Sequence, residues 1–117
     1  MGRRNWTREE TILAMDLYMR TPFSKIGKGN KDIIQLAQII NRTPDAVAYK
    51  MSNLAHYDPQ LQARNVSGFS HTSKLDKEIY EEFADNIEEL SFTAQHVLAE
   101  KKHTSVNSLL PELELDT

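Results

Sequence analysis

The sequence predicts an all-α fold, a bundle of three helices followed by one or two appended helices. Apolar residues recur at intervals of three and four in successive segments, and residues that cap helices stand directly before those segments. The chain has 117 residues and no cysteine, so its stability must come from packing. A hydrophobic content of 39% fits one small domain with a modest core.

The first helix is expected over residues 8–20. Thr7 is its predicted N-cap, and Glu10, three residues later, completes a capping box. The apolar stripe of this helix is broad, which predicts burial against more than one neighbour. Thr21 ends the helix because the residue before a proline, here Pro22, avoids the helical region.

A loop and a second helix follow. Residues 22–31 predict a loop in which Phe23 and Ile26 turn inward, while its lysines at 25, 28 and 31 remain solvated. Its two glycines could let the backbone approach a phosphate, although Gly-Lys-Gly lacks the spacing of a phosphate-binding loop. Asn30 is expected to cap the second helix, which should pack on the first. Its apolar residues repeat at intervals of three and four, namely Ile33, Ile34, Leu36, Ala37 and Ile40.

The second and third helices are joined by a tight turn. Asn41 can end the second helix because asparagine tolerates the left-handed backbone. Thr43 can cap the third helix, and Pro44 suits its first turn, where no amide donor is missed. The third helix is expected over residues 44–57, with Val47, Met51 and Leu54 on its core face. This arrangement is typical of a helix-turn-helix, so function is expected on the third helix.

The rest of the chain predicts a connection, an acidic helix and a tail. Residues 60–73 are expected to be irregular, after which Ser73 and Asp76 form a second capping box. Apolar residues then mark a fourth helix as far as Leu90, and residues 92–102 extend it or form a fifth. We therefore predict a helix-turn-helix domain at 1–66, a connecting loop and acidic helical extension at 67–103, and a tail or linker at 104–117.

Charge is distributed unevenly along the chain. The formal net charge is -3, but residues 1–66 carry ten Lys and Arg against six Asp and Glu, whereas residues 67–117 carry four against eleven. A positive first half suits a surface that meets phosphate, with an acidic second half pointing elsewhere. The carboxylates after residue 76 spread around their helix as a solvated face does, so we expect no metal site there.

Several function classes are not expected. No apolar run is long enough to span a bilayer, and the first residues lack the apolar core of a secretory signal, so we expect a cytoplasmic location. Histidines stand only at positions 56, 71, 96 and 103, with no pair at i and i+4. The sequence has no nucleophile elbow and no dinucleotide fingerprint. We expect no catalysis by this chain alone, and neither a cofactor nor a bound metal.

Two family resemblances meet in this sequence. The chain resembles a Myb or SANT-like repeat over roughly residues 5–57, through WTREE at 6–10, LA at 36–37, RTPDAV at 42–47 and KMSNL at 50–54. It departs from the repeats in the second helix, which is aliphatic, and at Met51, where they usually carry a tryptophan. The resemblance implies a three-helix fold whose third helix reads the major groove of DNA.

A wider pattern is similar to the amino-terminal region of bacterial HNH endonucleases described as restriction enzymes. It covers roughly residues 3–84 and adds Pro22, Phe23, DPQLQAR at 58–64 and SKLDKE at 73–78. In that family a nuclease module follows such a region. The resemblance implies that this chain is the targeting part of a nuclease and that its partner is double-stranded DNA.

The resemblance also implies which side chains meet DNA. The base-reading positions of the repeats fall at Ala48, Tyr49, Ser52 and Asn53, of which Asn53 could pair with adenine and Ala48 could touch only a thymine methyl. The candidates for phosphate contacts are the cations around this helix, namely Arg3, Arg4, Lys25, Lys28, Arg42 and Lys50. The alternative for each residue is a plain solvated side chain.

Two rival functions remain open. The chief rival is a SANT-like module in which the third helix and the acidic helix bind a peptide or a partner domain, which the net acidity favours. The second is a small free-standing transcription regulator. Because the cations are few, the domain alone should bind DNA weakly, and we expect specificity to require a homodimer or tethering to a nuclease module.

Overall fold

The all-α prediction is confirmed by the computed structural model, which describes residues 5–64 and 72–108, with side chains as far as residue 102. This part of the chain forms six α-helices and one 3-10 turn and contains no strand. In chain order the elements are α1 (Arg8–Arg20), η1 (Phe23–Lys25), α2 (Lys31–Ile40), α3 (Pro44–Ala55), α4 (Pro59–Ala63), α5 (Lys74–Phe83) and α6 (Ile87–Ser108).

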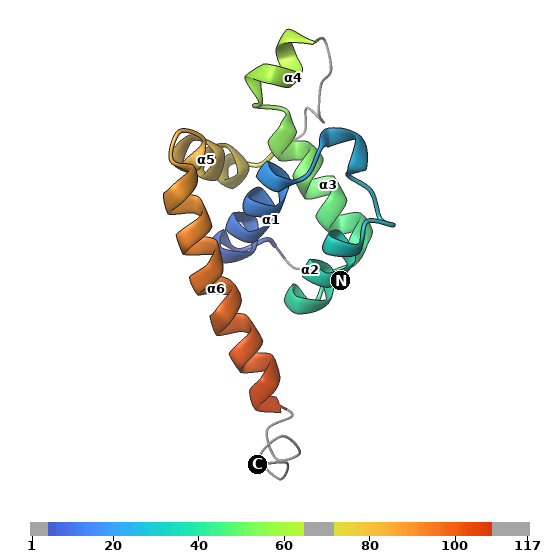
Figure 1. Cartoon of the computed structure of the whole chain (residues 1–117), viewed down its shortest axis with the longest axis vertical. Coiled ribbons are helices and arrows are strands. Elements are labelled where there is room, and N and C mark those ends of the chain that lie inside the picture. Colours follow the sequence, from blue (N-terminus) through green and yellow to red (C-terminus); the bar gives the residue numbers. More distant parts are fainter. Residues whose placement is uncertain (1–4, 65–71, 109–117) are drawn as a thin grey trace.

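Helix α1 lies at the centre of the molecule (Figure 1). It contacts α2, α3, α5 and α6, and its side chains from Glu10 to Met15 are all buried. The sequence predicted burial against more than one neighbour, and this is confirmed. A helix covered on nearly all sides must be apolar around most of its circumference, which explains its broad stripe.

The helices begin where the capping residues predict. In α1 the Thr7 hydroxyl accepts from the Glu10 amide and the Glu10 carboxylate accepts from the Thr7 amide, each at 3.1 Å. Ser73 and Asp76 make the same reciprocal pair at the start of α5, at 3.1 and 3.0 Å. Asn30 caps α2 by accepting from two backbone amides. These bonds satisfy amide groups that the first turn of a helix leaves without partners.

The turn between α2 and α3 takes only three residues. Asn41 adopts the left-handed conformation with φ 59° and ψ 51°, and the Arg42 amide donates to the Ala37 carbonyl at 2.8 Å. The Thr43 hydroxyl then accepts from the Ala46 amide at 3.1 Å and starts α3. The chain therefore turns while the Ala37 and Gln38 carbonyls at the end of α2 stay hydrogen-bonded.

One hydrophobic core runs through α1, α2, α3, α5 and α6. Val47, Met51 and Leu54 of α3 are fully buried, as their spacing predicted. The second half of the chain contributes core residues from α5 and α6, namely Ile79, Tyr80, Phe83, Leu90, Ala94 and Val97. The predicted boundary after residue 66 therefore does not separate two cores.

The prediction of an irregular connection over residues 60–73 is wrong at its start. Helix α4 forms there, because Asp58 accepts from the Gln60 amide at 2.9 Å and Pro59 occupies the first turn. The third helix, expected to reach residue 57, ends at Ala55. Residues 65–71 lie outside the described part of the chain.

The prediction of one helix from residue 74 to Leu90 is also wrong, because the chain turns between Phe83 and Ile87. The Asn86 amide donates to the Phe83 carbonyl at 2.9 Å, and α6 then starts in a new direction (Figure 1). The turn lets both α5 and α6 pack on α1, and it leaves Ile87 47% exposed. Helix α6 continues to Ser108, so the predicted tail does not begin at 104, and only its residues 109–117 lie outside the described part of the chain.

The left-handed turn generates a stability prediction. Asn41→Ala should lower the free energy of unfolding by about 1 kcal/mol, because a Cβ without a compensating polar group is strained in this conformation. Asn41→Gly should cost less, because glycine adopts positive φ without a clash. Urea unfolding of the three proteins measures the difference. An alanine variant as stable as the glycine variant would contradict the assigned backbone conformation.

Candidate functional site

The outward face of α3 is narrow. Its core face carries Val47, Met51 and Leu54, which are inaccessible to solvent. On the opposite side Tyr49 is 49% exposed, and Ala48 and Ser52, which are half-buried, lie beside it. Three of the four predicted base-contacting residues therefore remain accessible on one helical surface.

Asn53, the fourth of these residues, does not face outward. It is only 4% exposed, and its Oδ1 atom accepts no hydrogen bond from the part of the chain that the structure describes. Asn53 borders a hollow together with Trp6 and Leu75, which places it on the side of α3 that turns toward α5. We expected Asn53 to present its amide to a base edge. Because the side chain is buried, that expectation is wrong.

Lys50 is also buried rather than available to phosphate. Its Nζ lies 2.7 Å from Oδ1 of Asp76, and the two side chains are 9% and 0% exposed. The other carboxylate oxygen of Asp76 accepts from the Ser73 amide and so completes the capping box of α5. The expectation of a phosphate contact at Lys50 is corrected, because an internal carboxylate already neutralises this cation.

Arg42 repeats this arrangement at the start of α1. Its guanidinium donates to Oε1 of Glu10 at 2.9 Å and to the Asn5 carbonyl at 2.8 Å, and its side chain is 10% exposed. The guanidinium also lies 4.4 Å from the centre of the Trp6 ring, and the Lys50 ammonium lies 5.2 Å from it. Arg42 is therefore a structural cation between α1 and the turn before α3, and its predicted phosphate contact is corrected on the same ground.

The two ion pairs share one sequence signal. In each, the acid is the third helical residue of a capping box, and the cation comes from the α2–α3 turn or from α3. The sequence predicts both capping boxes, but it does not show that their carboxylates are buried. A capping carboxylate that is itself buried needs a counter-charge, and this requirement is the signal that points to Arg42 and Lys50.

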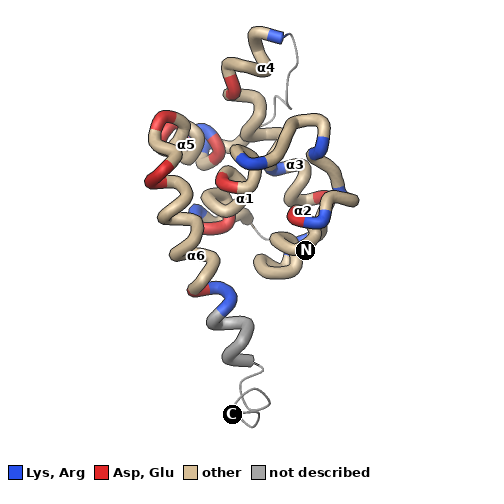
Figure 2. The backbone as a smooth tube through the Cα atoms, in the orientation of Figure 1, with Lys and Arg blue, Asp and Glu red and all other residues tan. Residues whose placement is uncertain are grey.

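The loop between α1 and α2 keeps its lysines in solvent. Lys25 and Lys28 are accessible, whereas Phe23 and Ile26 pack against the core, as predicted. Figure 2 shows that the acidic positions of α5 and of the start of α6 lie on the side of the molecule away from this loop. The remaining candidates for phosphate contacts, Arg3 and Arg4, lie outside the described residues.

The hydroxyl groups of Tyr18 and Tyr80 have raised pKa values. Both residues border a second hollow, next to α4. The Tyr18 hydroxyl donates to Oδ2 of Asp58, and burial followed by this hydrogen bond raises the pKa of Tyr18 above its ordinary value. Burial, with the nearby Asp58 charge, raises the pKa of Tyr80 to about 12. Both phenols therefore stay protonated at neutral pH. The hydrogen bond from Tyr18 to Asp58 connects α1 to the N-cap of α4.

The described ranges contain neither a metal site nor a membrane span. No group of three His, Cys, Asp or Glu side chains is placed to hold a metal ion in residues 5–64 and 72–102. Over the same part of the chain, no helix combines the length and the apolar character needed to cross a bilayer. Of the four histidines, the side chains of His56 and His96 are described. His56 follows the last residue of α3, and His96 lies on α6.

Comparison of the chain with protein-family models, with curated proteins and with solved structures found no match. Function is therefore inferred from the geometry and charges of the described residues, together with the sequence patterns.

The buried ion pair of α3 generates a second stability prediction. Asp76→Asn should lower the free energy of unfolding by about 3 kcal/mol, because it leaves the Lys50 ammonium buried without a counter-charge. The double variant Lys50→Met/Asp76→Asn should recover most of this loss, since it removes both charges. Chemical unfolding of the single and double variants gives the coupling directly.

An exposed ion pair of the same protein provides the control. Arg20 pairs with Asp16 at 2.9 Å but is 61% exposed, so Arg20→Met should cost less than about 1 kcal/mol. If Asp76→Asn costs no more than Arg20→Met, the buried pair does not have the structural role assigned to it.

Proposed function

We propose that this chain binds double-stranded DNA with a helix-turn-helix formed by α2 and α3. In this proposal the outward face of α3, with Ala48, Tyr49 and Ser52, enters the major groove. Lys25 and Lys28 hold the phosphate backbone beside it. Arg3 and Arg4, outside the described residues, remain proposed phosphate contacts on sequence grounds.

The observation that carries the proposal is the separation of charge across the fold. Lys25, Lys28 and Lys31 are accessible on the loop and at the first turn of α2, which packs against α3. Glu78, Glu81, Glu88 and Glu89 are exposed on α5 and α6. Figure 2 shows the acidic positions of α5 and of the start of α6 on the side of the molecule away from the loop. A chain of negative total charge can approach a polyanion only in an orientation that turns such a lysine surface toward it.

The side chains on the outward face of α3 limit which bases this face can recognise in the proposed complex. A serine hydroxyl bonds to several bases, a phenol can reach a base edge or a phosphate, and an alanine can touch a thymine methyl. Without Asn53, the surface contains no amide for bidentate pairing with adenine. The proposal therefore entails weak and salt-sensitive binding by one copy, with specificity supplied by a second copy or by a tethered module.

Targeting of an HNH endonuclease is the proposed biological role, and the sequence resemblance over residues 3–84 supports it. In that role the chain positions a nuclease module carried elsewhere in the full-length protein and performs no chemistry itself. The free-standing transcription regulator remains an alternative within the same DNA-binding class.

A protein-interaction module is the second candidate function. The observation that favours it is the acidic side of α5 and α6, where Phe92 is 69% exposed. The internal neutralisation of Arg42 and Lys50 also removes two cations that DNA binding would use. This candidate entails retention of a protein partner and no salt-dependent binding of DNA.

The phosphate contacts can be tested by removing the loop charges. Lys25→Gln/Lys28→Gln should weaken binding to all duplex sequences alike, and should reduce the slope of log K against log salt by about 0.9 for each phosphate that the variant no longer neutralises. Fluorescence anisotropy with labelled duplexes over a salt series measures both effects. Lys77→Gln/Lys101→Gln is the matched control, because it removes the same charge from α5 and α6 and should leave the slope unchanged. Equal effects of the two double variants would reject the lysine surface, and absence of duplex binding by the unaltered chain would reject the function.

The base-facing role of Tyr49 generates a separate prediction. Tyr49→Ala should alter the ranking of duplex sequences, because it removes the largest side chain that faces a base edge, while the salt slope changes little. Selection from a randomised duplex library, repeated with the variant, measures the ranking. An unchanged ranking together with a uniform loss of affinity would assign Tyr49 to the backbone instead.

A further inference from the structure

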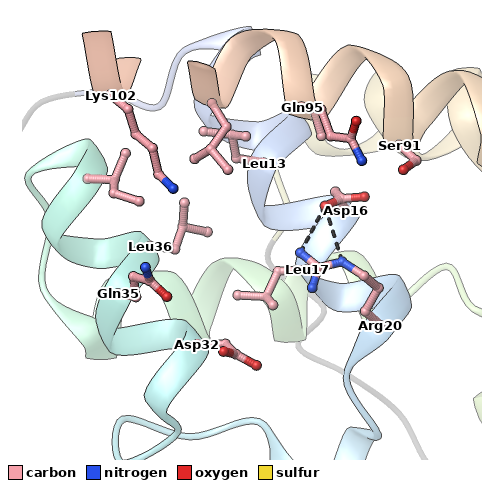
Figure 3. Close-up of a pocket in the computed structure, with 13 residues that line it drawn as sticks. Leu13, Asp16, Leu17, Arg20, Asp32, Gln35, Leu36, Ser91, Gln95 and Lys102 are labelled. Atoms are coloured by element: carbon pink, nitrogen blue, oxygen red, sulfur yellow. Dashed lines mark hydrogen bonds and ion pairs between the residues drawn. The ribbon is translucent and has the colours of Figure 1, made fainter. Parts of the chain in front are cut away.

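A groove with an apolar floor lies between α1, α2 and the middle of α6 (Figure 3). Its volume is about 410 Å³, and its floor includes Leu13, Leu17, Leu36 and Leu98. Removal of one buried leucine side chain leaves a cavity of about 150 Å³. The groove therefore has room for two side chains of this size.

Polar side chains border the groove without closing it. On α1 the Asp16 carboxylate is paired with Arg20 at 2.9 and 3.3 Å. On α6 the exposed Lys102 stands at one end, and Figure 3 shows its ammonium group reaching toward Leu36 of α2. Asp32 of α2 borders the groove at the end away from Lys102 (Figure 3). The Lys102 end, with the apolar floor beside it, therefore suits an apolar segment that carries acids.

The chain itself contains such a segment directly after α6. Residues 109–117 lie outside the described part of the chain, and their sequence is LLPELELDT. Leucine and glutamate alternate from Glu112 to Leu115, so an extended backbone places Leu113 and Leu115 on one face and Glu112 and Glu114 on the other. Pro111 prevents simple continuation of a helix through this segment.

The segment is long enough to reach back into the groove. Ser108, at the end of α6, is ten residues beyond Leu98, or about 15 Å along the helix axis. The seven residues from Ser108 to Leu115 span up to about 24 Å when extended. The difference leaves length for a reversal at residues 109–111, after which Leu113 and Leu115 come level with Lys102 and Leu98.

We propose that residues 112–115 dock into this groove of their own chain. Leu113 and Leu115 fill its apolar floor against Leu36 and Leu98, and the carboxylates of Glu112 and Glu114 lie beside the Lys102 ammonium. The segment thereby covers apolar surface that α1, α2 and α6 leave open, which removes it from water. Docking is independent of DNA binding, since the groove is formed by α1, α2 and α6 rather than by the outward face of α3.

The test uses the full chain with Leu113→Ser/Leu115→Ser. Methyl resonances of Leu36, Ile39 and Leu98 should shift relative to the unaltered chain, because the groove loses its two leucine neighbours. The thermal midpoint should fall by a few degrees, since buried apolar area is lost. Neither substitution alters a residue of the core that α1, α2, α3, α5 and α6 form, so the variant should remain folded.

A matched variant on the same helix provides the control. Phe92 is 69% exposed and does not border the groove, so Phe92→Ser removes an apolar side chain without disturbing these methyl groups. If Leu113→Ser/Leu115→Ser leaves the three methyl resonances where they are in the unaltered chain, the proposal is overturned.

Docking between two copies is distinguished by concentration. Binding within one chain predicts methyl shifts that do not change on dilution and a monomeric mass by sedimentation equilibrium at the same concentrations. Shifts that disappear on dilution together with a dimeric mass would overturn docking within the chain and assign the groove to the tail of a second copy.

Discussion

The structure depends on two carboxylates that are buried at the first turns of α1 and α5. Glu10 and Asp76 are 2% and 0% exposed, and each one both caps its helix and neutralises a cation. Charges taken out of water are tolerated only when a partner is held close, so the position of each helix start is tied to that of Arg42 or Lys50. These pairs, whose cations both lie close to the Trp6 ring, thereby fix α3 relative to α1 and α5.

This constraint determines which surface is left for function. The cations nearest to α3 serve the interior, and the accessible part of the helix is reduced to a strip centred on Tyr49. In the proposed complex with DNA, electrostatic attraction for the phosphates then comes from the loop before α2, where Lys25 and Lys28 are accessible to solvent. A helix can thus have the sequence pattern of a recognition helix while a neighbouring element takes up its charges.

Local sequence signals predicted the starts of the helices and the tight turn well, because capping and the left-handed asparagine depend on residues within a few positions of each other. Tertiary pairing could not be predicted in the same way. The burial of Lys50 and Asn53 depends on where α5 begins in space, and the periodicity of α3 contains no information about that position. The change of direction after Phe83 likewise follows from the docking of two helices on α1, whereas the apolar spacing alone fits one continuous helix.

The central place of α1 has a consequence for how the chain acquires its structure. Helix α1 packs against α6, the last helix in the described residues, and Leu90, Ala94 and Val97 belong to the same core as Ile12 and Leu13. Contacts between residues so far apart along the chain close large loops, and their entropic cost is recovered only when both ends are present. During synthesis on the ribosome, the apolar sides of α1 therefore remain without their final cover until the segment around Val97 has emerged. A protein made from the first 66 residues would lack α5 and α6, so the apolar sides of α1 that these helices cover would remain without that cover.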